Sequence, residues 1–133
     1  MTNLFIDNAF KLEVAAKQII SIESLEDALS LGDLQLGSYL VLGSATNMIM
    51  SEFYDGTIIK VSMSEIEQIS EEVTSVGAGL SWDQLISYCI DNNLFGIENL
   101  TLIPGSVGAA PVQNIGAYAV EISSVIESVT CYN

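Results

Sequence analysis

The chain is short, strongly acidic and rich in apolar residues, and these properties exclude several kinds of function. Its 133 residues, half of them hydrophobic, are enough to form one domain with a hydrophobic core. Three lysines oppose 17 acidic residues, there is no arginine and no histidine, and the net charge of −14 predicts binding neither to nucleic acid nor to anionic membranes.

The missing histidine and the two cysteines remove further chemistries. No Ser-His-Asp arrangement can form, and two cysteines alone cannot make a four-ligand zinc site, so we expect no metal. We expect Cys89 and Cys131 to be small core residues, although one disulfide is conceivable. The sequence has neither a membrane-length apolar run nor a signal peptide, which favours a cytoplasmic protein.

The first half of the chain predicts strands separated by a helix and turns. A strand is expected over residues 17–22, and then a helix with Ser24 as its N-cap and Asp27 in a capping-box-like position. The apolar run 39–42 predicts a buried strand, and residues 54–56 predict a turn before another strand over 57–61.

The second half predicts a hairpin, a helix and a final strand. Residues 64–79 read as the hairpin and residues 81–92 as the helix, capped by Ser81. The apolar stripe of this helix consists of Trp82, Leu85, Ile86, Cys89 and Ile90. Residues 123–132 alternate as in a strand that has no partner after it, which is typical of a fragment of a longer protein.

Two stretches of small residues stand out as candidate ligand-binding segments. Residues 43–47 follow a buried strand, and residues 100–121 contain both prolines and three glycines. Small side chains allow close approach of a ligand to the main chain, whose N–H groups can hold a phosphate without side-chain cations. A dinucleotide-fold fingerprint at 77–79 is disfavoured, because Trp82 occupies the place of its third glycine.

The ordered motifs resemble a known family. They are Gly43-Ser-Ala-Thr-Asn47, Asp55-Gly-Thr57, Gly77-Ala-Gly79 with Trp82, Gly96-Ile-Glu-Asn-Leu100, Ile103-Pro-Gly-Ser-Val-Gly108, Pro111-Val-Gln-Asn-Ile-Gly-Ala-Tyr118 and Glu121. From about residue 8 to its end, the chain resembles the UDP-N-acetylenolpyruvoylglucosamine reductase family, also called UDP-N-acetylmuramate dehydrogenases. These are cytosolic flavoenzymes of peptidoglycan synthesis and cell wall biogenesis.

The resemblance implies an α+β fold, the FAD-binding fold of vanillyl-alcohol oxidase, in two small α/β lobes. We expect the first lobe at residues 1–62 and the second at 63–133, truncated at its C-terminal end. It also implies a noncovalent FAD, reduced by NADPH, that in turn reduces a UDP-sugar, UDP-N-acetylglucosamine enolpyruvate, to UDP-N-acetylmuramate. The implied cofactor-binding residues are Gly43, Ser44, Ala45, Thr46, Asn47, Ile103, Pro104, Gly105, Ser106, Val107, Gly108, Asn114, Gly116 and Ala117, and Tyr118 is the implied substrate-binding residue.

The chain departs from the family in a few places. Ser44, Thr46 and Ala119 stand where the family favours glycine or serine, and the catalytic Arg, Ser and Glu motifs of the family have no match in this chain. We therefore expect no catalytic residue here, no turnover by this chain alone, and a substrate site completed by a missing C-terminal part.

Two alternative functions remain open on the sequence. One is a different oxidoreductase of the same flavin fold, and the other is a non-catalytic domain in which the glycines only permit tight packing. If backbone amides hold the FAD diphosphate, then Gly105→Val should weaken FAD binding, while Lys60→Ala should have little effect.

Overall fold

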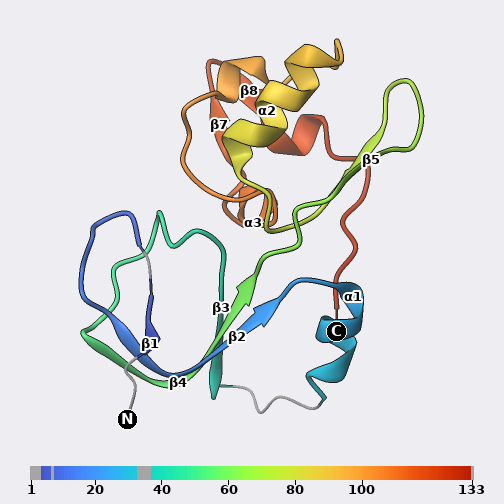
Figure 1. Ribbon diagram of the computed structural model, residues 1–133. Helices are drawn as coiled ribbons and strands as arrows, with labels where there is room; N and C mark the ends of the chain where they lie inside the picture. Colours follow the sequence, from blue (N-terminus) through green and yellow to red (C-terminus); the bar gives the residue numbers. More distant parts are fainter. Residues whose placement is uncertain (1–3, 7, 33–36, 133) are drawn as a thin grey trace.

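The computed structural model describes residues 4–6, 8–32 and 37–132, which form two groups of elements (Figure 1). The lower group in Figure 1 consists of β1 (Leu4–Phe5), β2 (Ala15–Ile22), α1 (Leu25–Ser30), β3 (Tyr39–Leu42) and β4 (Phe53–Val61). The upper group consists of β5 (Ile66–Gln68), β6 (Thr74–Val76), α2 (Trp82–Asp91), a 3-10 turn η1 (Glu98–Leu100), α3 (Ala109–Gln113), β7 (Gly116–Ala117), β8 (Val120–Glu121) and a second 3-10 turn η2 (Ile122–Ser124).

A four-stranded sheet of order β1-β2-β4-β3 organises the lower group. Strands β2, β4 and β3 are parallel, and β1 is antiparallel to β2. The predicted strands over 17–22 and 39–42 are therefore confirmed, the first beginning two residues earlier than expected. Because the three parallel strands run the same way, their carboxyl ends meet at one edge of the sheet.

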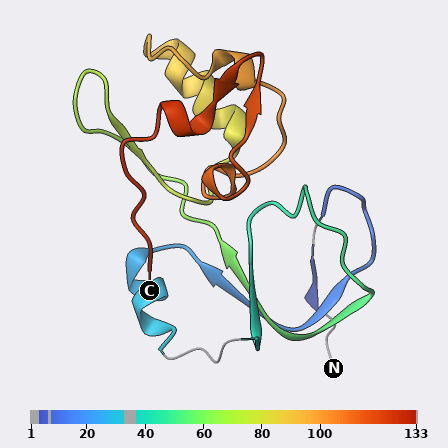
Figure 2. The same ribbon diagram turned by 180° about the vertical axis from the view of Figure 1, so that it is seen from behind.

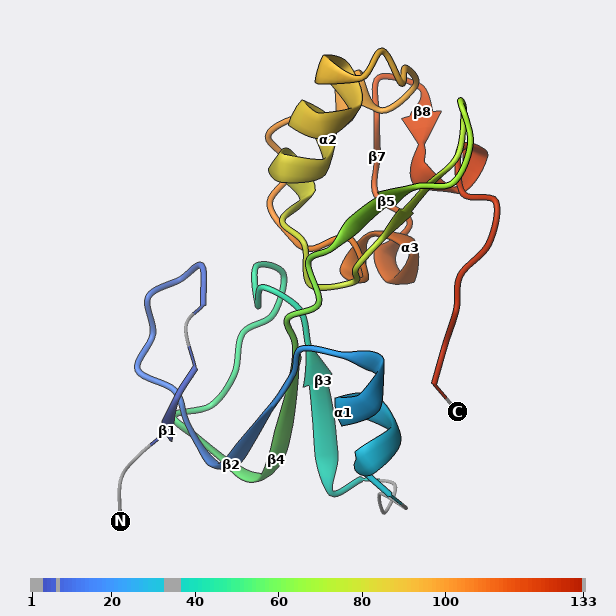
Figure 3. The same cartoon turned by 45° about the vertical axis from the view of Figure 1, so that its right-hand side comes forward.

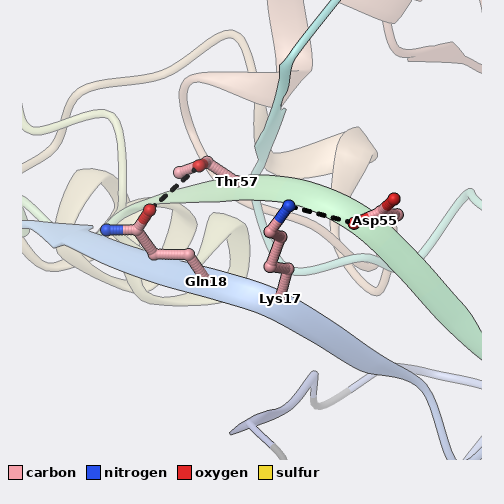
Figure 4. A network of polar contacts seen from close by, with 4 residues as sticks. All are labelled: Lys17, Gln18, Asp55 and Thr57. Atoms are coloured by element: carbon pink, nitrogen blue, oxygen red, sulfur yellow. Dashed lines mark hydrogen bonds and ion pairs between the residues drawn. The ribbon is translucent and has the colours of Figure 1, made fainter.

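The predicted turn at residues 54–56 is wrong, because these residues lie inside β4. Phe53 and Tyr54 pair with Ala15 and Ala16 of β2, and the register then shifts, because β4 has one extra residue before Thr57 pairs with Gln18. Gly56 is needed for a close approach rather than a turn: a Cβ there would lie 2.7 Å from the Tyr54 ring and 2.9 Å from the Ser38 carbonyl oxygen. Polar contacts between β2 and β4 flank this irregular region (Figure 4).

The sheet buries both faces against different partners. On one face, Ile22 and Ile59 pack with Ala28 of α1. The Ser24 hydroxyl accepts a hydrogen bond from the Asp27 amide (3.1 Å), so the predicted cap of α1 is confirmed. On the other face, a second cluster contains Ile6, Val14, Ala16, Leu42, Ala45 and Ile58.

The upper group has its own core, which lies between α2, α3, η1 and the β7–β8 hairpin. Its buried members are Leu80, Trp82, Leu85, Ile86, Cys89, Ile97, Leu100, Ala110, Ile115 and Ile122. The Trp82 indole nitrogen donates to the Leu100 carbonyl oxygen (2.9 Å), so the buried ring keeps its polar atom paired. The β5–β6 hairpin, which was correctly predicted, belongs to this group (Figure 3), and the Tyr88 hydroxyl of α2 donates to Oε1 of Gln68 in β5 (3.2 Å).

Helix α2 follows its prediction with two differences. Ser81 occupies the N-cap position, but its side chain makes no capping hydrogen bond. Four residues of the predicted stripe are buried, whereas Ile90 is 50% exposed at the edge of the stripe. Cys89 is buried as expected, and burial raises the pKa of its thiol, which keeps it in the unreactive protonated form.

The predicted strand over residues 123–132 is wrong. Residues 122–124 form η2, and Figure 2 shows the following segment leaving the upper group without joining a sheet. Within the described ranges no strand pairs with it, and Val125 and Val129 are exposed, so alternation alone could not specify a strand. Cys131, predicted to be a core residue, is also exposed, and both cysteines are free.

Among the residues that the structure describes, no helix has both the length and the apolar character needed to span a bilayer.

Candidate functional site

An open cavity of about 560 Å³ lies at the carboxyl edge of the parallel strands. Ligands of open α/β sheets bind at this edge, and pockets for small molecules typically measure ~300–1,000 Å³. The described residues that line the cavity are Phe5, Ile6, Ile19, Ser21, Leu42, Gly43, Ser44, Ile58, Lys60, Val61, Ser62, Gly79 and Ser106. The cavity therefore takes its floor from the sheet and part of its rim from the upper group.

The two small-residue loops meet at this cavity, although they are far apart in the sequence. A Cβ built on Gly43 would collide with the Ser106 hydroxyl, so glycine permits this contact. The Thr46 hydroxyl donates to the Pro104 carbonyl oxygen (3.3 Å). Nδ2 of the next residue, Asn47, donates to Oε1 of Gln113 at the end of α3 (2.8 Å).

The backbone amides of the two loops fall into two classes. The amides of Val107 and Gly108 donate to the carbonyl oxygens of Leu80 (2.9 Å) and Ala78 (2.8 Å). The amides of residues 43–47, and those of Gly105 and Ser106, donate no hydrogen bond to another described residue. The free donors therefore belong to the first loop and to the tip of the second.

The loop conformations are set by unusual backbone angles near these free donors. Ala45 adopts φ 49°, a left-handed conformation that is unfavourable for a residue with a Cβ, and Gly105 adopts φ 150°. Such conformations accumulate at ligand sites, where packing holds them in place. Here Ala45 is held because its side chain is buried in the sheet cluster.

The segment from Asn114 to Tyr118 lies beside the loops and does not line the cavity in the described part of the chain. Asn114 ends α3 in a left-handed conformation, and its side chain donates to Glu121 Oε2 (3.0 Å). Gly116 and Ala117 form β7, which pairs with β8. Tyr118, at the hairpin tip, is 85% exposed.

The hairpin tip carries strain that a substitution can relieve. Tyr118 (φ 51°) and Ala119 (φ 64°) form a two-residue loop with both φ angles positive, where glycine is strongly favoured at the second position. We expect Ala119→Gly to raise the free energy of unfolding by about 1 kcal/mol, because Ala119 is exposed and loses no packing. Urea denaturation measures both variants, and the control Ala109→Gly, in helix α3, should lower the free energy of unfolding by about 0.5–1 kcal/mol. A lower free energy of unfolding in Ala119→Gly would contradict the argument.

Several residues of the cavity were missed by the sequence analysis, notably Ser21, Lys60 and Ser62. Their signal was strand alternation: Ile58 and Lys60 share one face of β4, while Ile59 points to the α1 face. Among the described residues that line the cavity none is acidic, although the chain has 17 acidic residues. The described part of the lining therefore carries one cationic side chain, Lys60, and no carboxylate.

This donor set fits a cofactor that carries a diphosphate. Unpaired amides and the hydroxyls of Ser44 and Ser106 can donate to anionic oxygens, and the apolar side chains of the sheet face can contact rings. A Cβ on Gly105 would have only the Thr46 hydroxyl nearby, at 3.8 Å, so the tip of the second loop has room on that side.

Comparison with known proteins agrees with this chemistry. The sequence pattern of the family described as FAD binding domain matches residues 18–133. Proteins named UDP-N-acetylenolpyruvoylglucosamine reductase are similar to the chain. The one from Bacteroides fragilis (strain YCH46) is 37% identical over 98% of this chain and 41% of its own length. Those from Amoebophilus asiaticus and Salmonella typhimurium are 41% and 40% identical over 89% and 93% of this chain.

The chain spans 33–41% of the length of these three relatives. A solved structure, the UDP-N-acetylenolpyruvylglucosamine reductase (MurB) from Thermus caldophilus, aligns with a TM-score of 0.59 and 24% identity, over 77% of this chain and 37% of that one. At this identity the structural match carries the fold, and the expected α+β FAD-binding fold is confirmed.

Proposed function

The chain belongs to the FAD-binding domain family, and we propose that it is the FAD-binding portion of a UDP-N-acetylenolpyruvoylglucosamine reductase. The observation that carries the proposal is the meeting of two loops with unpaired amide donors at one cavity, whose described lining contains no acidic residue. Those loops are the segments 43–47 and 103–108, whose motifs occur in the family's order.

FAD would be held mainly by main-chain donors. The amides of residues 43–47, Gly105 and Ser106 would bind the diphosphate, and the apolar residues of the sheet face would contact the rings. The Thr46 side chain joins the two loops and the Asn47 side chain joins the first loop to α3, instead of binding the cofactor directly. When bound, FAD supplies the redox chemistry of the reductase, with NADPH as the hydride donor.

The remaining functional assignments extend this proposal. The substrate is UDP-N-acetylglucosamine enolpyruvate, and its catalytic residues lie outside this chain. Tyr118 contacts that substrate, because an exposed aromatic side chain on a hairpin tip with strained backbone angles is well placed to meet a ligand. The lobes divide near residue 62, where β4 ends, and the nucleotide substrates favour a cytoplasmic location.

The test is the FAD affinity of Gly105→Val. A hydrogen bond from an amide to a charged oxygen contributes roughly 1.5–3 kcal/mol, so blocking the loop tip should weaken FAD binding by about 10- to 100-fold. Because φ at Gly105 is 150°, the substitution also strains the backbone. Gly32→Val is the matched control, since Gly32 also has a positive φ (64°), meets nothing within 4 Å, and lies away from the cavity.

Flavin fluorescence titration gives the two affinities, and urea denaturation gives the two stabilities. Both variants should lose stability, but only Gly105→Val should lose FAD affinity. Equal affinity in Gly105→Val and the parent chain would overturn the assignment of this loop.

A non-catalytic domain is the second candidate, and one observation favours it. A Cβ on Gly108 would lie 2.7 Å from the Ala78 Cβ, so this glycine serves packing between segments. If every glycine served packing alone, the purified chain would show no flavin absorbance after incubation with FAD. A different oxidoreductase of the same flavin fold would bind FAD equally well, and would differ in the substrate that reoxidises the flavin.

A further inference from the structure

Lys60 lies at the centre of the cavity floor. Near the carboxyl end of β4 it pairs in register with Ser21 of β2 on one side and Leu42 of β3 on the other. All three residues line the cavity, and Leu42 directly precedes the loop at residues 43–47. The Lys60 side chain therefore starts beside the first group of unpaired amides.

Lys60 differs from Lys17 in its electrostatic surroundings. Lys17 Nζ forms an ion pair with Asp55 Oδ1 at 3.3 Å on the exposed surface of the sheet (Figure 4). Lys60 makes no ion pair with another described residue, and no described residue of the cavity lining is acidic. In a chain with a net charge of −14, a lysine that forms no ion pair with a described residue, in a cavity whose described lining holds no carboxylate, marks a place for an anion.

A second polar group in the cavity points the same way. Ser106 is only 3% exposed, yet its hydroxyl makes no hydrogen bond with another described residue. Ser106 lines the cavity, where an anionic ligand oxygen can accept a hydrogen bond from its hydroxyl. Ser106 comes from the second loop and Lys60 from the sheet, so a ligand that contacts both would bridge the two groups of elements.

We propose that the Lys60 ammonium group pairs with the diphosphate of FAD, together with the Ser106 hydroxyl and the free amides of residues 43–47. This inference rests on the proposed function, because it assigns a residue to the same cofactor. It replaces the expectation that Lys60→Ala has little effect. A single ammonium group attracts an anion strongly when, as among the described residues that line this cavity, no carboxylate neutralises it.

The experiment measures FAD affinity in the 133-residue chain and in Lys60→Met, Lys60→Arg and Lys17→Met. The two methionine variants carry the same net charge, so they experience the same overall repulsion of an anionic ligand. A charge-assisted contact predicts about tenfold weaker FAD binding in Lys60→Met, little change in Lys17→Met, and near-parental binding in Lys60→Arg. Riboflavin, which has no phosphate, should bind equally well to the parent chain and to Lys60→Met.

The salt dependence gives a second readout. Added salt screens the attraction of an exposed cation for the diphosphate, so the affinity of the parent chain should fall more steeply with salt than that of Lys60→Met. Equal FAD affinity and equal salt dependence in the two methionine variants would overturn the inference, as would an equal loss of riboflavin and FAD affinity in Lys60→Met. Failure of the parent chain itself to bind FAD would instead overturn the proposed function.

Discussion

The 133-residue chain, loaded with FAD, should oxidise NADPH at no measurable rate in the presence of UDP-N-acetylglucosamine enolpyruvate. Reduction of the enolpyruvyl group requires positioned donors or cations that stabilise negative charge on its carboxylate, and removing one such contact typically costs about 10²–10³ in rate. This chain contains no arginine, and Lys60 is assigned to the cofactor. Its net charge of −14 also repels an anionic UDP-sugar.

The measurement is NADPH absorbance at a fixed FAD occupancy, with the full-length Bacteroides fragilis relative as the positive control. The flavin absorbance spectrum reports how much FAD the chain holds, so it distinguishes a lack of catalytic groups from a lack of bound cofactor. A rate near that of the relative would mean that the catalytic groups lie within these 133 residues.

The largest loss of stability is expected for Leu100→Ala. Leu100 is 0% exposed at the centre of the upper core, and its carbonyl oxygen accepts the hydrogen bond from the buried Trp82 indole. Truncating a fully buried leucine leaves a cavity and costs about 2–5 kcal/mol. We therefore expect urea denaturation to give a free energy of unfolding about 3 kcal/mol lower than that of the parent chain.

Leu102→Ala is the matched control, because Leu102 is two residues away and 82% exposed. Its stability should change by less than about 0.5 kcal/mol. Similar losses in the two variants would show that the upper core does not centre on Leu100.

The sequence predicted the elements that have local signals. The β-branched run before Ser24 and the small polar cap itself were sufficient for β2 and α1, because both depend on neighbouring residues. Gly56 led to the wrong prediction of a turn. The sequence does not distinguish a glycine that makes a turn from one that, like Gly56, leaves room for the nearby Tyr54 ring. The alternation at residues 123–132 also misled it, because a strand requires a partner that periodicity does not reveal.

The candidate site was predictable in part for a similar reason. The small-residue loops are visible as motifs, and the structure brings them together, but the assignment of each residue to FAD stays a prediction. Lys60 was missed because its importance comes from its neighbours across the sheet, Ser21 and Leu42, and from the absence of acidic residues among the described lining. None of these relations can be read from residues 57–61 alone.

The hydrogen bonds Thr46–Pro104 and Asn47–Gln113 affect how cooperatively the two groups of elements unfold. They join the two groups of elements at the cavity, and both are exposed hydrogen bonds of modest strength. A ligand that spans the cavity would add contacts between the two groups. When a ligand binds only the folded protein, the free energy of unfolding rises by about 2.7 kcal/mol at a free ligand concentration of 100 times the Kd. Amide hydrogen exchange at residues 43–47, Gly105 and Ser106 should therefore slow when FAD is added, and the two groups should unfold together rather than one after the other.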